Sequence, residues 1–226
     1  MNIFTHGKNK AKKRKAESEQ QKESSPSAQE LTVSTVSGSK VLPMDVEFVI
    51  LKSKTSIDRQ KAGHISIVDK NLEVIYDQRV KWDSNLLHST PMWKQMTGFN
   101  VNSFKNGKEL NDVKEEVERI LGDNIVVVCG GWQGFYSIGL SMSNFNAVDI
   151  QKFWFKTTPT NPQEPIGLRS LVYHYYKQRL GDLHTASEDA VYAMKLYLDF
   201  YEKPSVGKGP AFNYIENVKK LNLKKF

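Results

Sequence analysis

"PMDVEFVILK" (residues 43 to 52) has the β-branched and aromatic composition of a β-strand and carries two acids on one side of it. Asp45 and Glu47 are two residues apart, so both carboxylates project to the same face. Two like charges this close repel each other unless a cation lies between them, and a hard divalent ion such as Mg²⁺ prefers oxygen ligands. An edge strand whose polar face meets water is the alternative explanation of this pair.

The segments around this strand predict an α/β domain. Two further strands, at 63 to 69 and 72 to 80, are joined by a short polar turn and predict an antiparallel meander with the first strand, which we expect to be central. The remaining expected elements are a short helix at 89 to 98, a helix at 108 to 122, a strand at 124 to 129, a helix from about Gln133, a strand at 145 to 150, and helices at 166 to 181 and 187 to 202, the last capped by Ser187. This order favours a mixed five-stranded sheet flanked by helices.

The net charge of +7 is concentrated in the two ends of the chain. Residues 1 to 40 carry +4 and residues 203 to 226 carry +5, which leaves −2 for residues 41 to 202. The first segment is polar and almost free of aromatic residues, so we expect a disordered tail there. Its run "KNKAKKRK" (8 to 15) is typical of nucleic-acid attraction or nuclear import, and such basic tails also suit protein partners. The folded domain is predicted to span 43 to 202.

Several classes of protein are disfavoured by the composition. The sequence contains no apolar run near the roughly 20 residues needed to span a bilayer, and its beginning lacks the apolar stretch of a secretory signal. We therefore expect a soluble protein with no membrane partner. The single cysteine, Cys129, excludes a disulfide framework and a zinc site built from cysteines, which fits a reducing compartment.

A second chemical motif lies in "HTASEDAVYAM" (184 to 194), where His184 precedes Asp189 by five residues and the aspartate opens a helix. Alone, a loop histidine capping a helix explains it. Together with Asp45-x-Glu47, however, it resembles the DEDDh three-prime-to-five-prime exonucleases of the ribonuclease H-like fold, specifically the RNA exonuclease 4 and interferon-stimulated exonuclease group. "HISIVDKNLEVIYDQRVK" (64 to 81) and "KQMTGFNVNSF" (94 to 104) are also similar to segments of that family. The resemblance covers residues 43 to 202.

The resemblance implies a set of roles for these residues. Asp45 would bridge two Mg²⁺ or Mn²⁺ ions, Glu47 and Asp189 would complete the shell of the first ion, and His184 would act as general base. The implied substrate is single-stranded RNA or another nucleic acid. The implied location is the nucleus, including the nucleolus.

One acid of the family pattern is missing. Family members carry a further aspartate shortly after the fourth strand, in a segment that leads into a helix. The corresponding segment here is "VCGGWQGFYSIGL" (128 to 140), and the aligned position is Phe135. No Asp or Glu lies between Asn124 and Val148. The resemblance therefore implies one intact ion site and a second one compromised by Phe135.

Three functions are consistent with this pattern. The first is a degenerate exonuclease-like domain that binds or acts on RNA with weak or absent catalysis. The second is an active exoribonuclease of RNA processing, including ribosomal RNA, in which Asp149 or a solvent-held ion compensates. The third is a non-catalytic module for protein interaction or for a phosphate ligand held by "GGWQG" (130 to 134) at a helix N-terminus.

Overall fold

The computed structural model describes residues 40 to 52, 60 to 156, 160 to 161 and 164 to 202. The predicted tail at 1 to 40, apart from Lys40, and the basic extension at 203 to 226 lie outside the described residues. The predicted domain bounds therefore stay predictions.

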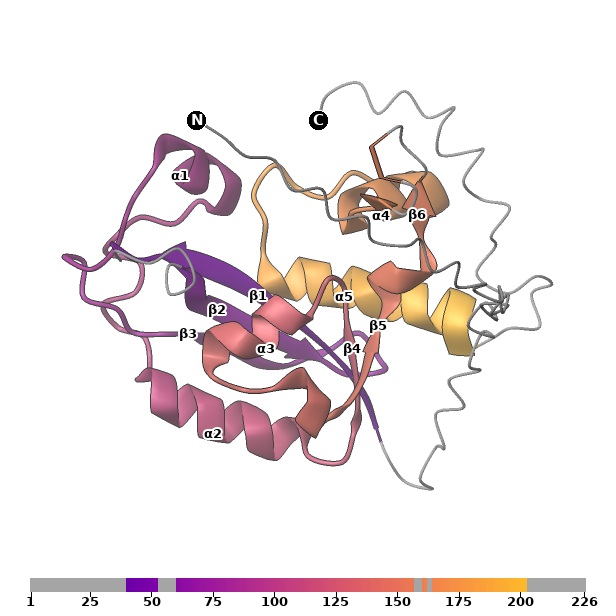
Figure 1. The fold of residues 1–226 in the computed structure, drawn as a ribbon, viewed down its shortest axis with the longest axis horizontal. Coiled ribbons are helices and arrows are strands. Elements are labelled where there is room, and N and C mark those ends of the chain that lie inside the picture. Colours follow the sequence, from indigo (N-terminus) through magenta and orange to yellow (C-terminus); the bar gives the residue numbers. More distant parts are fainter. Residues whose placement is uncertain (1–39, 53–59, 157–159, 162–163, 203–226) are drawn as a thin grey trace, which may run out of the picture. The chain divides into compact units, whose positions relative to one another are not determined.

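A five-stranded sheet forms the centre of the described fold (Figure 1). Its strands lie in the order β3-β2-β1-β4-β5. β1 pairs with β2, and β2 with β3, in antiparallel fashion, whereas β1 with β4 and β4 with β5 are parallel. Their bounds are Val41–Ile50 (β1), Gln60–Val68 (β2), Val74–Arg79 (β3), Ile125–Val128 (β4) and Asn146–Asp149 (β5). The predicted mixed sheet, the meander and the central place of the first strand are confirmed.

The predicted helices are present, with different bounds for some of them. They are α1 (Pro91–Thr97), α2 (Leu110–Leu121), α3 (Trp132–Ile138), α4 (Leu168–Tyr176) and α5 (Ala186–Tyr197); α5 continues into a π-helical turn at Leu198–Glu202. Short 3-10 helices at Met142–Asn144 and Ile150–Phe153 and a small hairpin of β6 (Phe155–Lys156) and β7 (Glu164–Pro165) complete the described elements. α4 ends earlier than the predicted 181 because Lys177 adopts a left-handed conformation with φ of 56°. None of the described helices is long and apolar enough to cross a membrane.

Helices cover both faces of the sheet (Figure 1). α2 and α3 pack on one face, where their buried side chains join alternate residues of β1 in the main core. The β1 members of that core are Leu42, Met44 and Val46. Because side chains alternate along a strand, Asp45 and Glu47 lie on the opposite face. α5 packs against β1, β2 and β4 on that face.

The end of β1 is fixed by α1. The pairing of β1 with β2 shifts between Glu47 and Phe48, which marks a bulge directly after the second acid. The indole nitrogen Nε1 of Trp93 then donates a hydrogen bond of 2.9 Å to the carbonyl oxygen of Phe48. α1 is itself capped by Thr90, whose side chain accepts from the backbone N–H of Trp93. The strand that carries the acids is therefore held at both of its edges and at its end.

Candidate functional site

The two acids of the first strand lie inside the fold. β1 has β2 on one side and β4 on the other, so the alternative of an exposed edge strand is wrong. Glu47 is only 9% exposed, and Asp45 is partly buried. Their side chains lie toward the carboxyl ends of the parallel pair β1 and β4, the usual position for ligand sites in α/β sheets.

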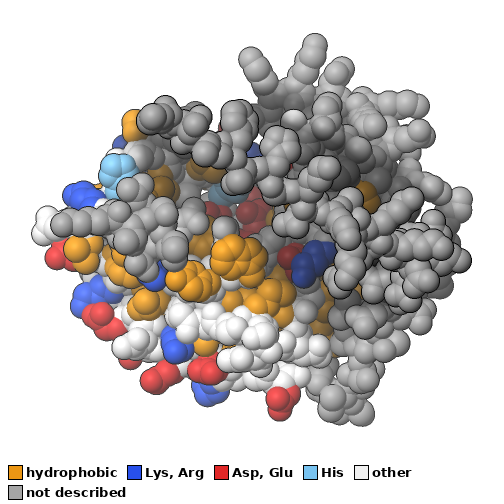
Figure 2. Space-filling model, in the orientation of Figure 1, with side chains coloured by type: hydrophobic (Ala, Val, Ile, Leu, Met, Phe, Trp, Pro, Cys, Tyr) orange, Lys and Arg blue, Asp and Glu red, His pale blue; other side chains and the backbone are white. Residues whose placement is uncertain are grey.

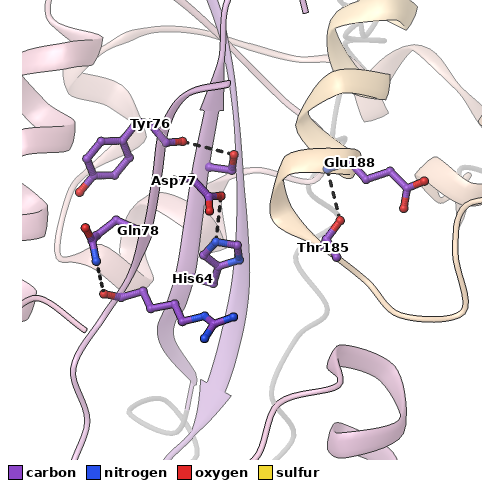
Figure 3. Close-up of polar contacts among 8 residues, drawn as sticks. His64, Tyr76, Asp77, Gln78, Thr185 and Glu188 are labelled. Atoms are coloured by element: carbon purple, nitrogen blue, oxygen red, sulfur yellow. Dashed lines mark hydrogen bonds and ion pairs between the residues drawn. The ribbon is translucent and has the colours of Figure 1, made fainter. Parts of the chain in front are cut away.

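The start of α5 brings the other two predicted residues to the same place. Thr185 caps this helix, since its hydroxyl oxygen accepts from the backbone N–H of Glu188 at 3.4 Å (Figure 3), so the expectation that Ser187 is the cap was wrong. Asp189 lies in the first turn, is 9% exposed, and donates its backbone N–H to the carbonyl of Thr185. His184 precedes the cap, and its backbone N–H donates to the carbonyl oxygen of Met96 at 2.7 Å. That bond ties the histidine loop to α1.

Glu47, His184 and Asp189 form one cluster. Each offers a ligand atom, and these atoms lie within 4.8 Å of one another. Within the cluster, Nδ1 of His184 is 3.5 Å from Oδ2 of Asp189. Asp45 lies next to the cluster rather than within that radius, and the charges of Asp189 and Glu47 both act on it. The structure thus brings together all four residues predicted for the site.

The electrostatics of this cluster favour a bound cation. Burial, followed by the negative charge of Asp189 and then of Glu47, raises the pKa of Asp45 well above its usual range. Burial and then Asp189 raise the pKa of Glu47 to about 7, although His184 and Arg169 act in the opposite direction. Carboxylates packed together away from water are costly when all are ionised, and a divalent cation removes this cost. The oxygen-rich donor set therefore fits a hard divalent cation.

The histidine is oriented by its neighbour. The hydrogen bond to Asp189 raises the pKa of His184, while burial and the positive charge of Arg169 oppose that shift. With Nδ1 directed at Asp189, the other ring nitrogen, Nε2, remains for a water or a substrate group. This arrangement of histidine and carboxylate is one that a general base requires.

A positive side chain that we did not single out from the sequence lies beside the acids. Arg169, in the first turn of α4, acts electrostatically on both Glu47 and His184. Its Nη2 donates to the carbonyl oxygens of Gly181 at 2.6 Å and Asp182 at 3.4 Å, in the loop that leads to His184. Its Nε is buried and has no hydrogen-bond partner among the residues that the structure describes. An isolated arginine in a helix pattern carries no signal of such a position, because the contact depends on the tertiary fold.

Three glycines line a cavity next to Asp45. A cavity of about 50 Å³ adjoins Asp45 and is bounded by Phe48, Cys129, Gly130, Gly131 and Gly134, together with Met44, Val46 and Val128. Among the described residues that line it, Asp45 is the only carboxylate.

Phe135, however, does not fill the second half of the site, and this part of the prediction was wrong. Its side chain is fully buried in the main core, and its ring centroid is 5.2 Å from that of Phe145. The residue of α3 that borders the cavity is Gly134, where a Cβ atom would lie 3.4 Å from Cγ2 of Val46. The two positions are adjacent in sequence and differ by about 100° around the helix axis.

Asp149, the acid considered as a compensating ligand, has a structural role. It ends β5, and its Oδ1 accepts from the backbone N–H groups of Gly130 at 2.9 Å and Gln151 at 3.1 Å. These bonds fasten the turn after β4 to β5. Asp149 is not a member of the cluster formed by the described acids and histidines.

The glycines after β4 are explained by packing. A Cβ atom on Gly131 would lie 2.0 Å from the side chain of Val128, and Gly130 has φ of +77°, which is strained for other residues. The turn therefore requires glycine whether or not it binds a phosphate. These glycines therefore do not support the hypothesis of a phosphate ligand held by residues 130 to 134.

Comparison with known proteins supports the fold. The sequence matches no protein-family model and no curated protein. Among solved structures, it is similar to the Neurospora crassa Pan2 catalytic unit (protease and nuclease domain), with 17% identity and a TM-score of 0.60 over 82% of this chain and 30% of that one. It is also similar to the Saccharomyces cerevisiae Pan2 pseudoubiquitin hydrolase-RNA exonuclease module in complex with AAUUAA RNA, with 20% identity and a TM-score of 0.65 over 83% and 33%.

The apo form of the yeast module gives a similar match, with 19% identity and a TM-score of 0.63 over 80% of this chain and 31% of that one. The chain thus spans about a third of the length of the proteins it matches. At these identities the likeness concerns the fold. The described part of the chain therefore has an α/β fold similar to that of the Pan2 RNA exonuclease modules.

Proposed function

We propose that this domain binds the three-prime end of single-stranded RNA at one divalent cation held by Glu47 and Asp189 with Asp45 beside them, and that it hydrolyses RNA slowly. The observation that carries this proposal is the convergence of Glu47, His184 and Asp189 within 4.8 Å, inside an exonuclease-like fold. The related yeast module is an RNA exonuclease described in complex with RNA. The single-stranded RNA substrate of this chain is inferred from that likeness.

The cluster supplies the groups that such binding needs. When bound, Mg²⁺ or Mn²⁺ would offset the charge of a phosphate oxygen. His184, oriented by Asp189, has a free Nε2 to accept a proton from an attacking water. Arg169 presents positive charge next to the acids, which suits a phosphate.

We expect slow hydrolysis because the described lining of the cavity next to Asp45 has glycine where a second metal ligand would be needed. A two-metal mechanism needs ligands on both sides of the reacting phosphate. Asp45 is the only acid among the described residues that line the cavity next to Gly134. The loss of one group that stabilises transition-state charge costs a hundredfold or more in rate, on the order of 3 kcal/mol. Since Oδ1 of Asp149 is engaged by two backbone groups, no observation favours the alternative of a fully active enzyme.

Three finer assignments belong to this proposal as predictions. Membership of the RNA exonuclease 4 and interferon-stimulated exonuclease group depends on the motifs around Asp45 and His184. Nuclear location and protein partners depend on the basic tails, which lie outside the described residues. We retain them as part of the proposal.

The test is a paired binding and trimming assay with three-prime-labelled and five-prime-labelled single-stranded RNA, in Mg²⁺ and in EDTA. We expect binding that depends on Mg²⁺, is lost in Asp189→Asn, and is kept in the exposed control Asp112→Asn. We expect slow trimming that Asp45→Ala abolishes. The proposal would be refuted if the wild type bound RNA as tightly in EDTA as in Mg²⁺ and if Asp189→Asn bound RNA as tightly as the wild type. Rapid trimming that Asp45→Ala abolishes would establish the active alternative instead.

A further inference from the structure

Two large aromatic side chains stand exposed on α3. Trp132 is 61% exposed and Tyr136 is 44% exposed. They are four residues apart, so they are neighbours on one side of the helix, and their ring centroids are 6.4 Å apart with an angle of 56° between the planes. Tryptophan is usually well buried, and an exposed aromatic pair is a common mark of a binding surface.

A positive charge accompanies this pair. Nζ of Lys61, on β2, lies 5.5 Å from the ring centroid of Tyr136, within the range of a cation–π interaction. The surface therefore offers ring faces and an ammonium group together. A patch for a protein partner needs no such cation, whereas each nucleotide of RNA presents a flat base and a negative phosphate. The combination favours a nucleic acid as the occupant.

The helix that carries the pair also lines the cavity next to Asp45. α3 follows Gly131, and Gly131 and Gly134 both line the cavity that contains Asp45. The side of this helix that carries Gly134 thus borders the cavity at Asp45, and the other side of the helix carries Trp132 and Tyr136. Figure 2 shows hydrophobic side chains gathered in the middle of the view, where Figure 1 has α3, next to recessed acidic and histidine side chains. A strand of RNA whose end lies at the acids can continue over this helix.

We propose that Trp132 and Tyr136 form a stacking platform for an unpaired base of single-stranded RNA, and that Lys61 contacts the adjoining phosphate. This inference rests on the proposed function, because it takes the three-prime end of the RNA to lie at Glu47 and Asp189. The base on the platform is then on the five-prime side of the terminal nucleotide. Stacking is tolerant of sequence, so the platform accepts any base.

The experiment measures the affinity of a five-prime-labelled oligoadenylate by fluorescence anisotropy. Trp132→Ala is expected to weaken binding by roughly 5- to 150-fold, the range for the loss of one stacked base. Trp132→Phe keeps a ring and should retain most of the affinity. Ile75→Ala, which removes a similarly exposed apolar side chain from β3, should bind as the wild type does. Equal affinity of wild type and Trp132→Ala would overturn the platform.

A second arm separates stacking from a structural effect. Oligoadenylates that each contain one abasic position are compared between wild type and Trp132→Ala. At one position near the three-prime end, the abasic RNA should bind both proteins equally, because the partner of the tryptophan is then absent. If Trp132→Ala lowers the affinity of every abasic RNA by the same factor, the effect is not stacking and the platform is refuted.

The platform and the proposed function fail in different ways. Each titration is run in Mg²⁺ and in EDTA. The factor lost in Trp132→Ala should be the same in both, since stacking does not involve the cation. A wild type whose affinity ignores Mg²⁺, with a Trp132 effect intact, overturns the cation site and keeps the platform. A wild type that binds no RNA in either condition overturns both.

Discussion

Replacing Glu47 by glutamine should stabilise the metal-free protein at alkaline pH and leave it unchanged at acidic pH. Burial and Asp189 raise the pKa of Glu47 from 4.5 to about 7, so the folded state holds this proton more tightly than the unfolded state does. Stability from this group is fully present below about pH 4.5 and falls as the pH rises through 7. Above that pH the ionised carboxylate carries the whole penalty, which glutamine lacks.

The size of the effect follows from the shift. At about 1.36 kcal/mol per unit, the change from 4.5 to about 7 corresponds to a penalty of about 3 kcal/mol at high pH. For a domain of this size that is roughly 6 to 12 °C in melting temperature. Added Mg²⁺ should raise the melting temperature of the wild type at high pH and have little effect on Glu47→Gln.

The assay is thermal unfolding by circular dichroism in EDTA at a series of pH values from 5 to about 8.5, with the difference between variant and wild type as the readout. The exposed Glu73, just before β3, provides the control Glu73→Gln, which should follow the wild type throughout. A Glu47→Gln variant that is equal to or less stable than the wild type at high pH would refute the electrostatic reasoning.

Four further substitutions test the residues around the cavity next to Asp45 and the arginine beside the acids. Gly134→Asp should raise Mg²⁺-dependent RNA trimming by roughly tenfold or more, since the new carboxylate would face the cavity. Phe135→Asp should instead destabilise the fold by on the order of 4 kcal/mol without a gain in trimming, because Phe135 is fully buried. The reverse outcome would show that Phe135 faces the site. Gly131→Val should lower the free energy of unfolding by about 3 kcal/mol through collision with Val128, as urea titration would show, and an unchanged midpoint would contradict the packing argument. Arg169→Met should weaken RNA binding and reduce the slope of log affinity against log salt by about one, the loss of one phosphate contact, and an unchanged slope would remove Arg169 from the RNA site.

The parts of the fold that sequence reasoning reached are those set by local pattern. The alternation along β1 placed Asp45 and Glu47 on one face, and the composition of the first three strands predicted the meander. The spacing of His184 and Asp189 predicted a pair at the start of a helix, which the structure places beside Glu47. These features depend on neighbours in sequence and on the packing of α5 against β1.

The features that sequence reasoning missed depend on helix phase and tertiary contact. The prediction for Phe135 failed because a shift of one residue in a short helix turns a side chain by about 100°, and the glycines before α3 leave its start undetermined. Thr185 and Ser187 both have hydroxyl groups able to cap α5, and only the backbone conformation decides between them. Arg169 lies on α4, donates a hydrogen bond to the loop before His184 and acts electrostatically on Glu47. No local sequence pattern predicts these tertiary contacts.

The most direct measurement is calorimetric titration of the metal-free protein with Mn²⁺ at pH 8. The arrangement of Glu47, Asp189 and Asp45 predicts one ion per chain, with binding lost in Asp189→Asn and kept in Asp112→Asn. Heat that is absent in the wild type, or a single-ion isotherm that survives in Asp189→Asn, would contradict the claim that these acids hold a cation.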